Sequence, residues 1–345
     1  KYQIEYYDVR NMLHQFNLYD DSYSGDIIEV QGRIYLDTSK ANHPLDIIRG
    51  LGLKVEFEAN KDLTFEELYG QEEKTFLVTY FRDGNLTFKG WLEPSGFYED
   101  FVSNEWRISV DCVDGLNYLT NYSFVNNDGT PITGRKTQLE VLLLALNRTE
   151  LNKSLNTSID IYYTGLSTSV NVLDNVYVVT DRYIKDDGET FMSCIEVIKD
   201  ILESYNAILH SRGDGWWIYR PNQLYSNYTQ YFYNYLYTGV SGIDFNYNFE
   251  QTLGSDVDGF YPHHCSANQQ LSLYNSIGAY RVSYKYGLEP SLIDNHRLIS
   301  TDGTTIDDWQ ILDSSNFAEL VPGHGRIDLF NLERVLFGPQ AHDFF

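Results

Sequence analysis

Short runs in which apolar and polar residues alternate constrain the fold most, because a period of two buries one face of a β-strand. Such runs fill much of residues 26–57 and recur at 106–113. In the clearest pair, residues 75–82 and 86–92 flank Asp83-Gly84-Asn85. Because Asp-Gly tolerates positive φ, this pair is predicted to form a β-hairpin. We expect residues 1–118 to form a first, barrel-like antiparallel β-domain.

Two helices are predicted further along the chain. Capping boxes of the form Thr/Ser-x-x-Glu begin at Thr137 and at Ser193, where a hydroxyl and a carboxylate satisfy free N–H groups of the first turn. The predicted helices span about 137–148 and 193–205. A hairpin around Gly213-Asp214-Gly215 follows the second helix. Residues 119–225 therefore read as an α/β accessory domain.

The chain from residue 226 to 286 is rich in tyrosine, and we interpret it as part of a second barrel. Four of its tyrosines are spaced by two and would share one face of a strand. The simpler interpretation is a sheet that buries the rings and leaves the hydroxyls in water. The alternative is an exposed aromatic platform for a glycan or a partner protein. Residues 287–345 are expected to form a β-rich C-terminal segment, which would be the start of a jelly-roll domain. The candidate surface residues are Tyr231, Tyr233, Tyr235 and Trp309, and Tyr237 completes the run of four.

Charge and composition exclude several classes of protein. The formal net charge is −24, whereas proteins that grip nucleic-acid phosphates need a basic surface. With 42% hydrophobic and 15% aromatic residues, the chain is also too apolar to be an acidic disordered protein. No apolar run approaches the roughly 18 residues of a membrane span, and the N-terminal residues lack the pattern of a signal peptide. We expect a folded protein that is made in the cytoplasm.

No catalytic, cofactor-binding or metal-binding residue is predicted, and the chain is not expected to be an enzyme. Cys194 begins a helix, but no histidine lies near it in sequence, so we interpret it as a buried structural thiol. His263-His264-Cys265 has no second ligand pair at a useful spacing. Asp186-Asp187-Gly188-Glu189 and Asp256-x-Asp258-Gly259 do not continue into a calcium loop, and both read as turns.

Several runs of residues resemble tail proteins of phages and prophages of gut Bacteroides-type bacteria. The resemblance covers residues 26–225 diffusely and includes no catalytic signature. It rests on Ile48-Arg49-Gly50-Leu51-Gly52-Leu53, Phe65-Glu66-Glu67-Leu68-Tyr69, the Arg82-Asp83-Gly84 hairpin ending in Gly90-Trp91-Leu92-Glu93-Pro94, Asp111-Cys112-Val113-Asp114-Gly115-Leu116, Ile161-Tyr162-Tyr163-Thr164, Asp186-Asp187-Gly188 and Trp216-Trp217-Ile218-Tyr219-Arg220-Pro221.

The resemblance implies a tail hub or tail-tip (baseplate) protein of the virion. Such hubs imply tube-like β-barrels with an α/β accessory segment, assembled as a homotrimer whose barrels form a pseudo-sixfold ring below the tail tube. The implied partners are the tail-tube, distal-tail and tape measure proteins, and DNA passing through the lumen without specific binding. In that ring, acidic residues are expected to line the lumen, while faces between subunits carry few charges.

Two other functions stay open at this stage. The tyrosine-rich stretch and the region around Trp309 suit a carbohydrate-binding module that recognises a host surface glycan. A cell-wall or polysaccharide hydrolase would need two carboxylates held across a cleft, but a chain with 49 acidic residues offers too many pairs to single one out.

Overall fold

The structure is a computed structural model of the chain, and its described residues belong to the compact unit Lys1–Tyr284. Trp309, the His263-His264-Cys265 run, the Asp256–Gly259 turn and the expected jelly-roll lie outside the described residues. The described residues are 1–8, 11–37, 46–59, 65–68, 72–93, 95, 98–99, 106–159, 170–185, 187–221 and 229–248.

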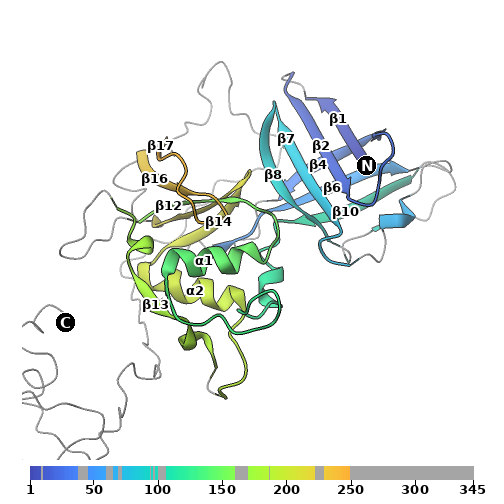
Figure 1. The fold of residues 1–345 in the computed structure, drawn as a ribbon. Coiled ribbons are helices and arrows are strands. Elements are labelled where there is room, and N and C mark those ends of the chain that lie inside the picture. The colour runs from blue at the N-terminus through green and yellow to red at the C-terminus, as the bar shows by residue number, and fades with distance from the viewer. Residues whose placement is uncertain are drawn as a thin grey trace, which may run out of the picture. The chain divides into compact units, whose positions relative to one another are not determined.

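The fold is mainly β with α+β parts, as predicted, and its first half is a curled sheet that is antiparallel except for the parallel pair β1–β3 (Figure 1). The strand order is β3-β1-β2-β7-β8-β10-β6-β4, with β9 paired to β10. The predicted hairpin is confirmed, and Asp83 and Gly84 at its turn both have positive φ. The strands are β1 (Tyr2–Tyr7), β2 (Leu13–Asp20), β3 (Ile28–Glu29), β4 (Gly32–Asp37), β6 (Gly52–Ala59), β7 (Phe76–Arg82), β8 (Asn85–Leu92), β9 (Tyr98–Glu99) and β10 (Trp106–Val113).

One continuous segment joins the two ends of this sheet and closes it into a barrel. Strand β3 pairs with β1, whereas β4, only two residues further along, pairs with β6 at the opposite end of the sheet. Backbone hydrogen bonds continue through the link, from Val30 N to Gln3 O and from Glu58 N to Gln31 O. Closure leaves neither β1 nor β6 as a free edge, which removes a template for unwanted strand pairing.

Side chains fill the interior of the barrel. Inward-facing residues of the strands form one core cluster, and Phe65 and Leu68, beside and within the 3₁₀ turn η1 (Glu66–Leu68), belong to it with no exposed surface. The Phe65 ring lies 4.7 Å from that of Phe57 and 5.0 Å from that of Tyr2. Because it is packed in this way, the barrel itself is a solid element and not a pore.

The second half of the described chain is a mixed sheet covered on one face by two helices (Figure 1). Its strand order is β17-β16-β12-β15-β14-β5, in which β12 runs parallel to β15 and β14 parallel to β5. Further elements are β5 (Ile48–Arg49), η2 (Tyr118–Thr120), β11 (Arg135–Thr137), α1 (Gln138–Asn147), β12 (Ser154–Ser158), η3 (Val172–Asp174), β13 (Tyr177–Val179), η4 (Thr180–Tyr183), α2 (Cys194–Tyr205), β14 (Ile208–Arg212), β15 (Gly215–Tyr219), β16 (Thr229–Tyr235) and β17 (Phe245–Asn248).

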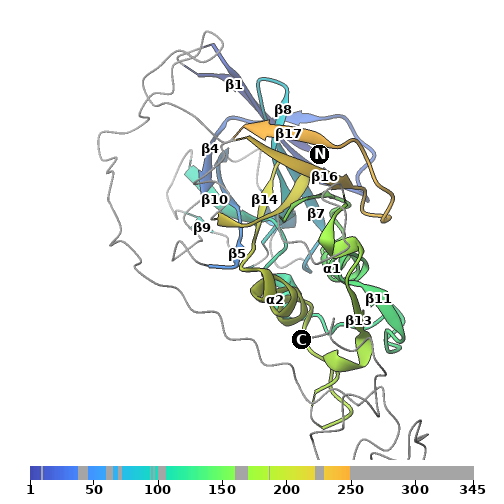
Figure 2. The ribbon, with the colours of Figure 1, turned by 90° about the vertical axis from the view of Figure 1, so that its left-hand side faces the viewer.

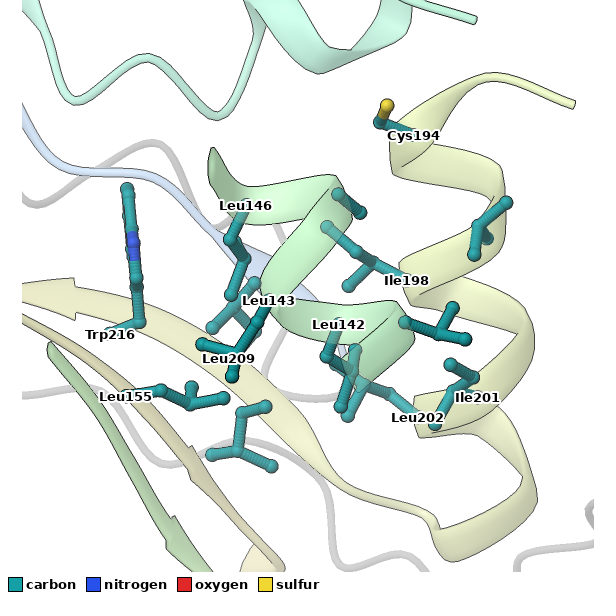
Figure 3. Packing of buried hydrophobic residues seen from close by; sticks show 14 of the residues in the cluster. Leu142, Leu143, Leu146, Leu155, Cys194, Ile198, Ile201, Leu202, Leu209 and Trp216 are labelled. Atoms are coloured by element: carbon teal, nitrogen blue, oxygen red, sulfur yellow. The ribbon is translucent and has the colours of Figure 1, made fainter. Parts of the chain in front are cut away.

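Both predicted capping boxes form. Thr137 Oγ1 accepts from Glu140 N while Glu140 Oε2 accepts from Thr137 N, and Ser193 and Glu196 repeat the arrangement. In Figure 3 the leucines of α1 fill the space between α2 and the sheet. The residues that meet there include Leu142, Leu143 and Leu146 of α1, Ile198, Ile201 and Leu202 of α2, and Leu155, Leu209 and Trp216 of the sheet.

The two halves are joined through backbone and not only through side chains. Strand β5 pairs with β14 of the second sheet, yet only two residues later the chain enters β6 of the barrel (Figure 2). Asp114 Oδ2 accepts from Leu51 N at 2.7 Å, next to this crossing point. On the barrel side, the indole of Trp91 donates to Thr149 O at 2.8 Å. The barrel and the helix-covered sheet therefore share one hydrogen-bond network.

A buried lysine lies close to this joint. Lys153 is 2% exposed, donates to Ser211 Oγ at 2.8 Å and places its ammonium group 4.3 Å from the centre of the Trp216 ring. Burial lowers the pKa of Lys153 to about 8, although the charge of Asp114 acts in the opposite direction. The ammonium group of Lys153 contacts a hydroxyl and an aromatic face and is attracted by a distant carboxylate. None of these groups fully replaces the hydration that the ammonium group loses on burial.

The closing segment generates the first prediction. A Cβ at Gly32 would collide with the Glu56 carbonyl oxygen and with Ile4 Cδ1, so Gly32→Ala must push β4 away from β6. We expect a loss of about 2–4 kcal/mol in the free energy of unfolding, measured by urea denaturation. The matched control is Gly50→Ala, whose new methyl group meets nothing closer than Asp114 Oδ1 at 3.6 Å. Equal stability of the two variants would contradict barrel closure through this segment.

Lys153 generates a prediction about pH. Its pKa is about 8 in the folded protein and about 10.4 in an unfolded chain. Between these values the unfolded state binds more protons, so the stability of the wild type rises with pH. Relative to Lys153→Met, which cannot titrate, the wild type should gain about 2 kcal/mol between pH 7 and pH 10. Urea denaturation of both proteins across this range measures the difference, and a pH-independent difference would show that the ammonium group is not desolvated.

Candidate functional site

One sector of the barrel's outer surface carries almost no charge. Side chains of β1, β2 and β7 alternate between the core and the outside, and Glu5 is the only charged residue among those facing outward. In the whole chain 21% of residues are charged, so this sector is depleted. We call it the neutral sector. It consists of Gln3, Glu5, Tyr7, Leu13, Gln15, Asn17, Tyr19, Leu77, Thr79 and Phe81. Within it, Thr79 is buried and Leu77 packs against the core of the helix-covered sheet.

Amide and hydroxyl groups form a ladder across the neutral sector. Gln3 Nε2 donates to Asn17 Oδ1 at 3.1 Å, and Asn17 Nδ2 donates to Thr79 Oγ1 at 3.5 Å. Thr79 Oγ1 in turn donates to the Tyr19 hydroxyl at 3.4 Å. Because their hydrogen bonds are partly satisfied within the sheet, these groups can be covered by another protein surface at lower cost than free charges.

The sector formed by β4, β6 and β10 has a different surface. Its outward-facing charges stand opposite one another on neighbouring strands, with Arg33 opposite Glu56 and Asp111 opposite Lys54. Arg107 and Glu58 are also opposite, with 3.9 Å between Nη2 and Oε1. Opposite charges across strands support the sheet by a few tenths of a kcal/mol each. The excess negative charge of the chain therefore does not come from this sector.

The candidate tyrosines of β16 lie at different depths. Tyr231, Tyr233 and Tyr235 share one side of the strand, but exposure falls from 46% at Tyr231 to 5% at Tyr235. The Tyr231 hydroxyl donates to Asp244 Oδ2 at 2.7 Å, and its ring lies 5.1 Å from that of Tyr233. The Tyr235 hydroxyl accepts from Asn171 Nδ2 at 3.1 Å inside the core. Tyr237 follows the end of the strand and is 42% exposed.

A hydrogen-bonded Asp-His-Tyr arrangement, which sequence spacing does not reveal, lies at one end of the barrel. His14 Nδ1 is 2.7 Å from the Tyr80 hydroxyl, and His14 Nε2 is 3.3 Å from Asp8 Oδ2. The Tyr6 ring stacks on the imidazole with 4.9 Å between centroids. Burial raises the pKa of Tyr80 to about 12, so its hydroxyl keeps its proton at neutral pH. The arrangement ties β1, β2 and β7 together and does not activate a nucleophile.

The interpretation of Cys194 as a structural thiol is confirmed. Its side chain has no exposed surface, its Sγ lies 3.6 Å from Ser123 O, and burial raises its pKa to about 11. Asp187 is confirmed as part of a turn, because its carboxylate accepts from the backbone N–H groups of Glu189 and Thr190 and from the Thr190 hydroxyl. Neither residue offers reactive chemistry.

A cleft of about 350 Å³ lies beside β5, where the barrel meets the helix-covered sheet. Its charged lining residues are Asp46, Asp114 and Lys199. The Asp114 carboxylate accepts from the backbone N–H groups of Leu51 and Leu116, so its role is to hold the joint.

Among the residues that the structure describes, no group of three or more His, Cys, Asp or Glu side chains is placed to hold a metal ion. In the same residues, no helix has both the length and the apolar character needed to cross a bilayer.

Comparison with known proteins finds no matching family model and no matching curated protein. Among solved structures, the chain is similar to the 43 kDa tail protein of prophage MuSo2 from Shewanella oneidensis, with a TM-score of 0.35 and 12% identity over 60% of this chain and 53% of that one. It is also similar to a tail protein from Neisseria meningitidis MC58, with a TM-score of 0.30 and 11% identity over 48% and 41% of the two chains. A third is prophage tail protein gp18 from Listeria monocytogenes EGD-e, with a TM-score of 0.29 and 10% identity over 56% and 44%.

All three of these similar structures are tail proteins, and the first and third come from prophages. The chain spans about half the length of each or less.

The contrast between the tyrosines of β16 can be tested. Tyr235→Phe removes a buried acceptor and leaves one Asn171 amide hydrogen without its partner, so we expect it to lower the free energy of unfolding by about 1–2 kcal/mol. Tyr231→Phe removes an exposed hydroxyl and should leave stability unchanged. Urea denaturation of both variants measures this. Equal effects of the two substitutions would contradict the assignment of Tyr235 to the core.

Proposed function

We propose that this protein is a structural component of a phage tail or a related injection machine, acting at the tail tip as a hub. In this proposal, copies of the chain form a homotrimeric ring that continues the tail tube and carries the parts that contact the host. The ring contacts tail-tube, distal-tail and tape measure proteins, and it has no catalytic activity. The family resemblance in residues 26–225 motivates the proposal.

The neutral sector is the observation that carries the proposal. Interface centres are depleted in charged residues, and a chain with a net charge of −24 has few surfaces on which another acidic copy can lie. The sector spans three neighbouring strands, and its polar groups already bond to one another. It therefore suits a face that is covered in an assembly.

The rigid joint is a second support. A ring under a tail tube must transmit force between its barrel and its outer part without hinging. Here a strand shared with the second sheet and a buried indole hydrogen bond link the two. Because side chains fill the barrel, a DNA channel in this proposal lies between copies and not through one barrel.

The acidic balance fits the same proposal. DNA sliding through a lumen is held back by basic walls, because each phosphate contact by Lys or Arg adds affinity. Acidic residues facing the lumen repel the backbone and keep it mobile.

Sedimentation equilibrium of the purified protein tests the proposal. A trimer has a mass of about 120 kDa, three times the chain mass of 40.0 kDa, and we expect it at micromolar concentrations. The variant Asn17→Lys places a charge in the middle of the neutral sector and should weaken the trimer at least tenfold. The control Arg107→Lys lies in the charge-paired sector and should not. A wild-type protein that stays monomeric at high concentration would overturn the proposal.

A further inference from the structure

The connection between β16 and β17 is an ordered loop, residues 236–244, which we call the tip. Leu236 N donates to Val240 O at 2.9 Å, and Gly242 N donates to Asn234 O at 2.6 Å. The last residue of helix α1 contacts the tip, because Asn147 Nδ2 donates to Tyr237 O at 3.0 Å. The tip therefore presents its side chains in a fixed arrangement.

The tip exposes apolar side chains to water. Ile243 is 84% exposed and Val240 61%, while Leu236 and Tyr237 are 45% and 42% exposed. Single exposed apolar residues are ordinary, but four within eight positions of one short loop form a patch typical of a binding surface. Covering such a patch removes apolar area from water, which favours association.

The tip ends in an acidic residue. The Asp244 carboxylate accepts from the Tyr231 hydroxyl at 2.7 Å. This hydrogen bond is the main cause that raises the pKa of Tyr231 to about 12. A surface that combines positive charge with apolar area would therefore complement the tip.

The chain carries such a surface on the ribbon formed by β11 and β13. Arg135 is exposed, and its guanidinium group lies 4.3 Å from the centre of the Tyr177 ring, which is 51% exposed. Lys136 follows on the same strand. Within the described residues, neither cation forms an ion pair with a carboxylate. An Arg stacked on an open tyrosine offers both a positive charge and a flat apolar face.

We propose that the tip of one copy binds the Arg135–Tyr177 ribbon of a second copy. This inference rests on the proposed ring function and names a contact within that ring. Ile243 and Val240 pack on the Tyr177 ring and the Arg135 side chain, and the Asp244 carboxylate meets Arg135. Charge complementarity selects this pairing, since copies with a net charge of −24 repel each other over most other approaches.

Three substitutions at the tip and ribbon test the contact by sedimentation equilibrium. Ile243→Ser removes an exposed side chain, so folding should be unchanged while self-association weakens at least tenfold. Asp244→Lys and Arg135→Glu should each weaken self-association to a similar degree. The double variant Asp244→Lys/Arg135→Glu restores opposite charges across the contact and should recover most of the lost association. The control Lys54→Glu reverses an exposed charge on β6 of the barrel, outside the tip and the ribbon, and should assemble as the wild type does.

The outcomes separate this inference from the proposed function. If the wild type forms a trimer and the tip and ribbon variants form it equally well, the proposed contact is wrong and the tip binds another partner. The proposed ring function would then still stand. If the single charge variants dissociate but the double variant does not recover, the direct pairing of Asp244 with Arg135 is overturned. If the wild type is monomeric, the proposed function fails together with this contact.

Discussion

The pairing of Ile48–Arg49 with β14 is the constraint on which the rest of the described structure depends. It holds the chain in the helix-covered sheet just before Gly50 and Leu51 lead it into the barrel. Asp114 fixes the same turn from the other side by accepting the Leu51 N–H. Without this crossing, fewer backbone contacts would join the barrel to the second sheet, among them the hydrogen bond from Gly213 N to Thr87 O at 3.2 Å. With it, the surfaces of the two parts keep fixed positions for assembly.

Local signals made much of the fold predictable. The Asp-Gly turn requires two residues at positive φ, and both Asp83 and Gly84 adopt it. The capping boxes at Thr137 and Ser193 begin the two helices where the sequence places them. These features depend on residues within a few positions of one another, so the sequence contains all the information that they need.

Features that depend on distant partners could not be predicted. Nothing near Ile48 or Gly32 in the sequence shows that one strand pairs with β14 or that the other closes the barrel against Glu56. The alternation of Tyr231, Tyr233 and Tyr235 predicts that they share one face of the strand, but it does not predict how deeply each ring is buried. The burial of Tyr235 depends on Asn171 and on the helices, which are distant in the sequence. The excess of acidic residues follows from the composition alone. The neutral sector can be recognised only when the pairing of β1, β2 and β7 is known, because that pairing brings its residues together.

A single-particle cryo-EM reconstruction of the assembled protein tests the central claim most directly. The account predicts a threefold ring with a central opening, neighbouring copies covering Asn17 and Tyr19, and acidic side chains at the opening. Particles of single copies, or a ring in which the β1–β2–β7 surface faces solvent while charged surfaces meet, would contradict it.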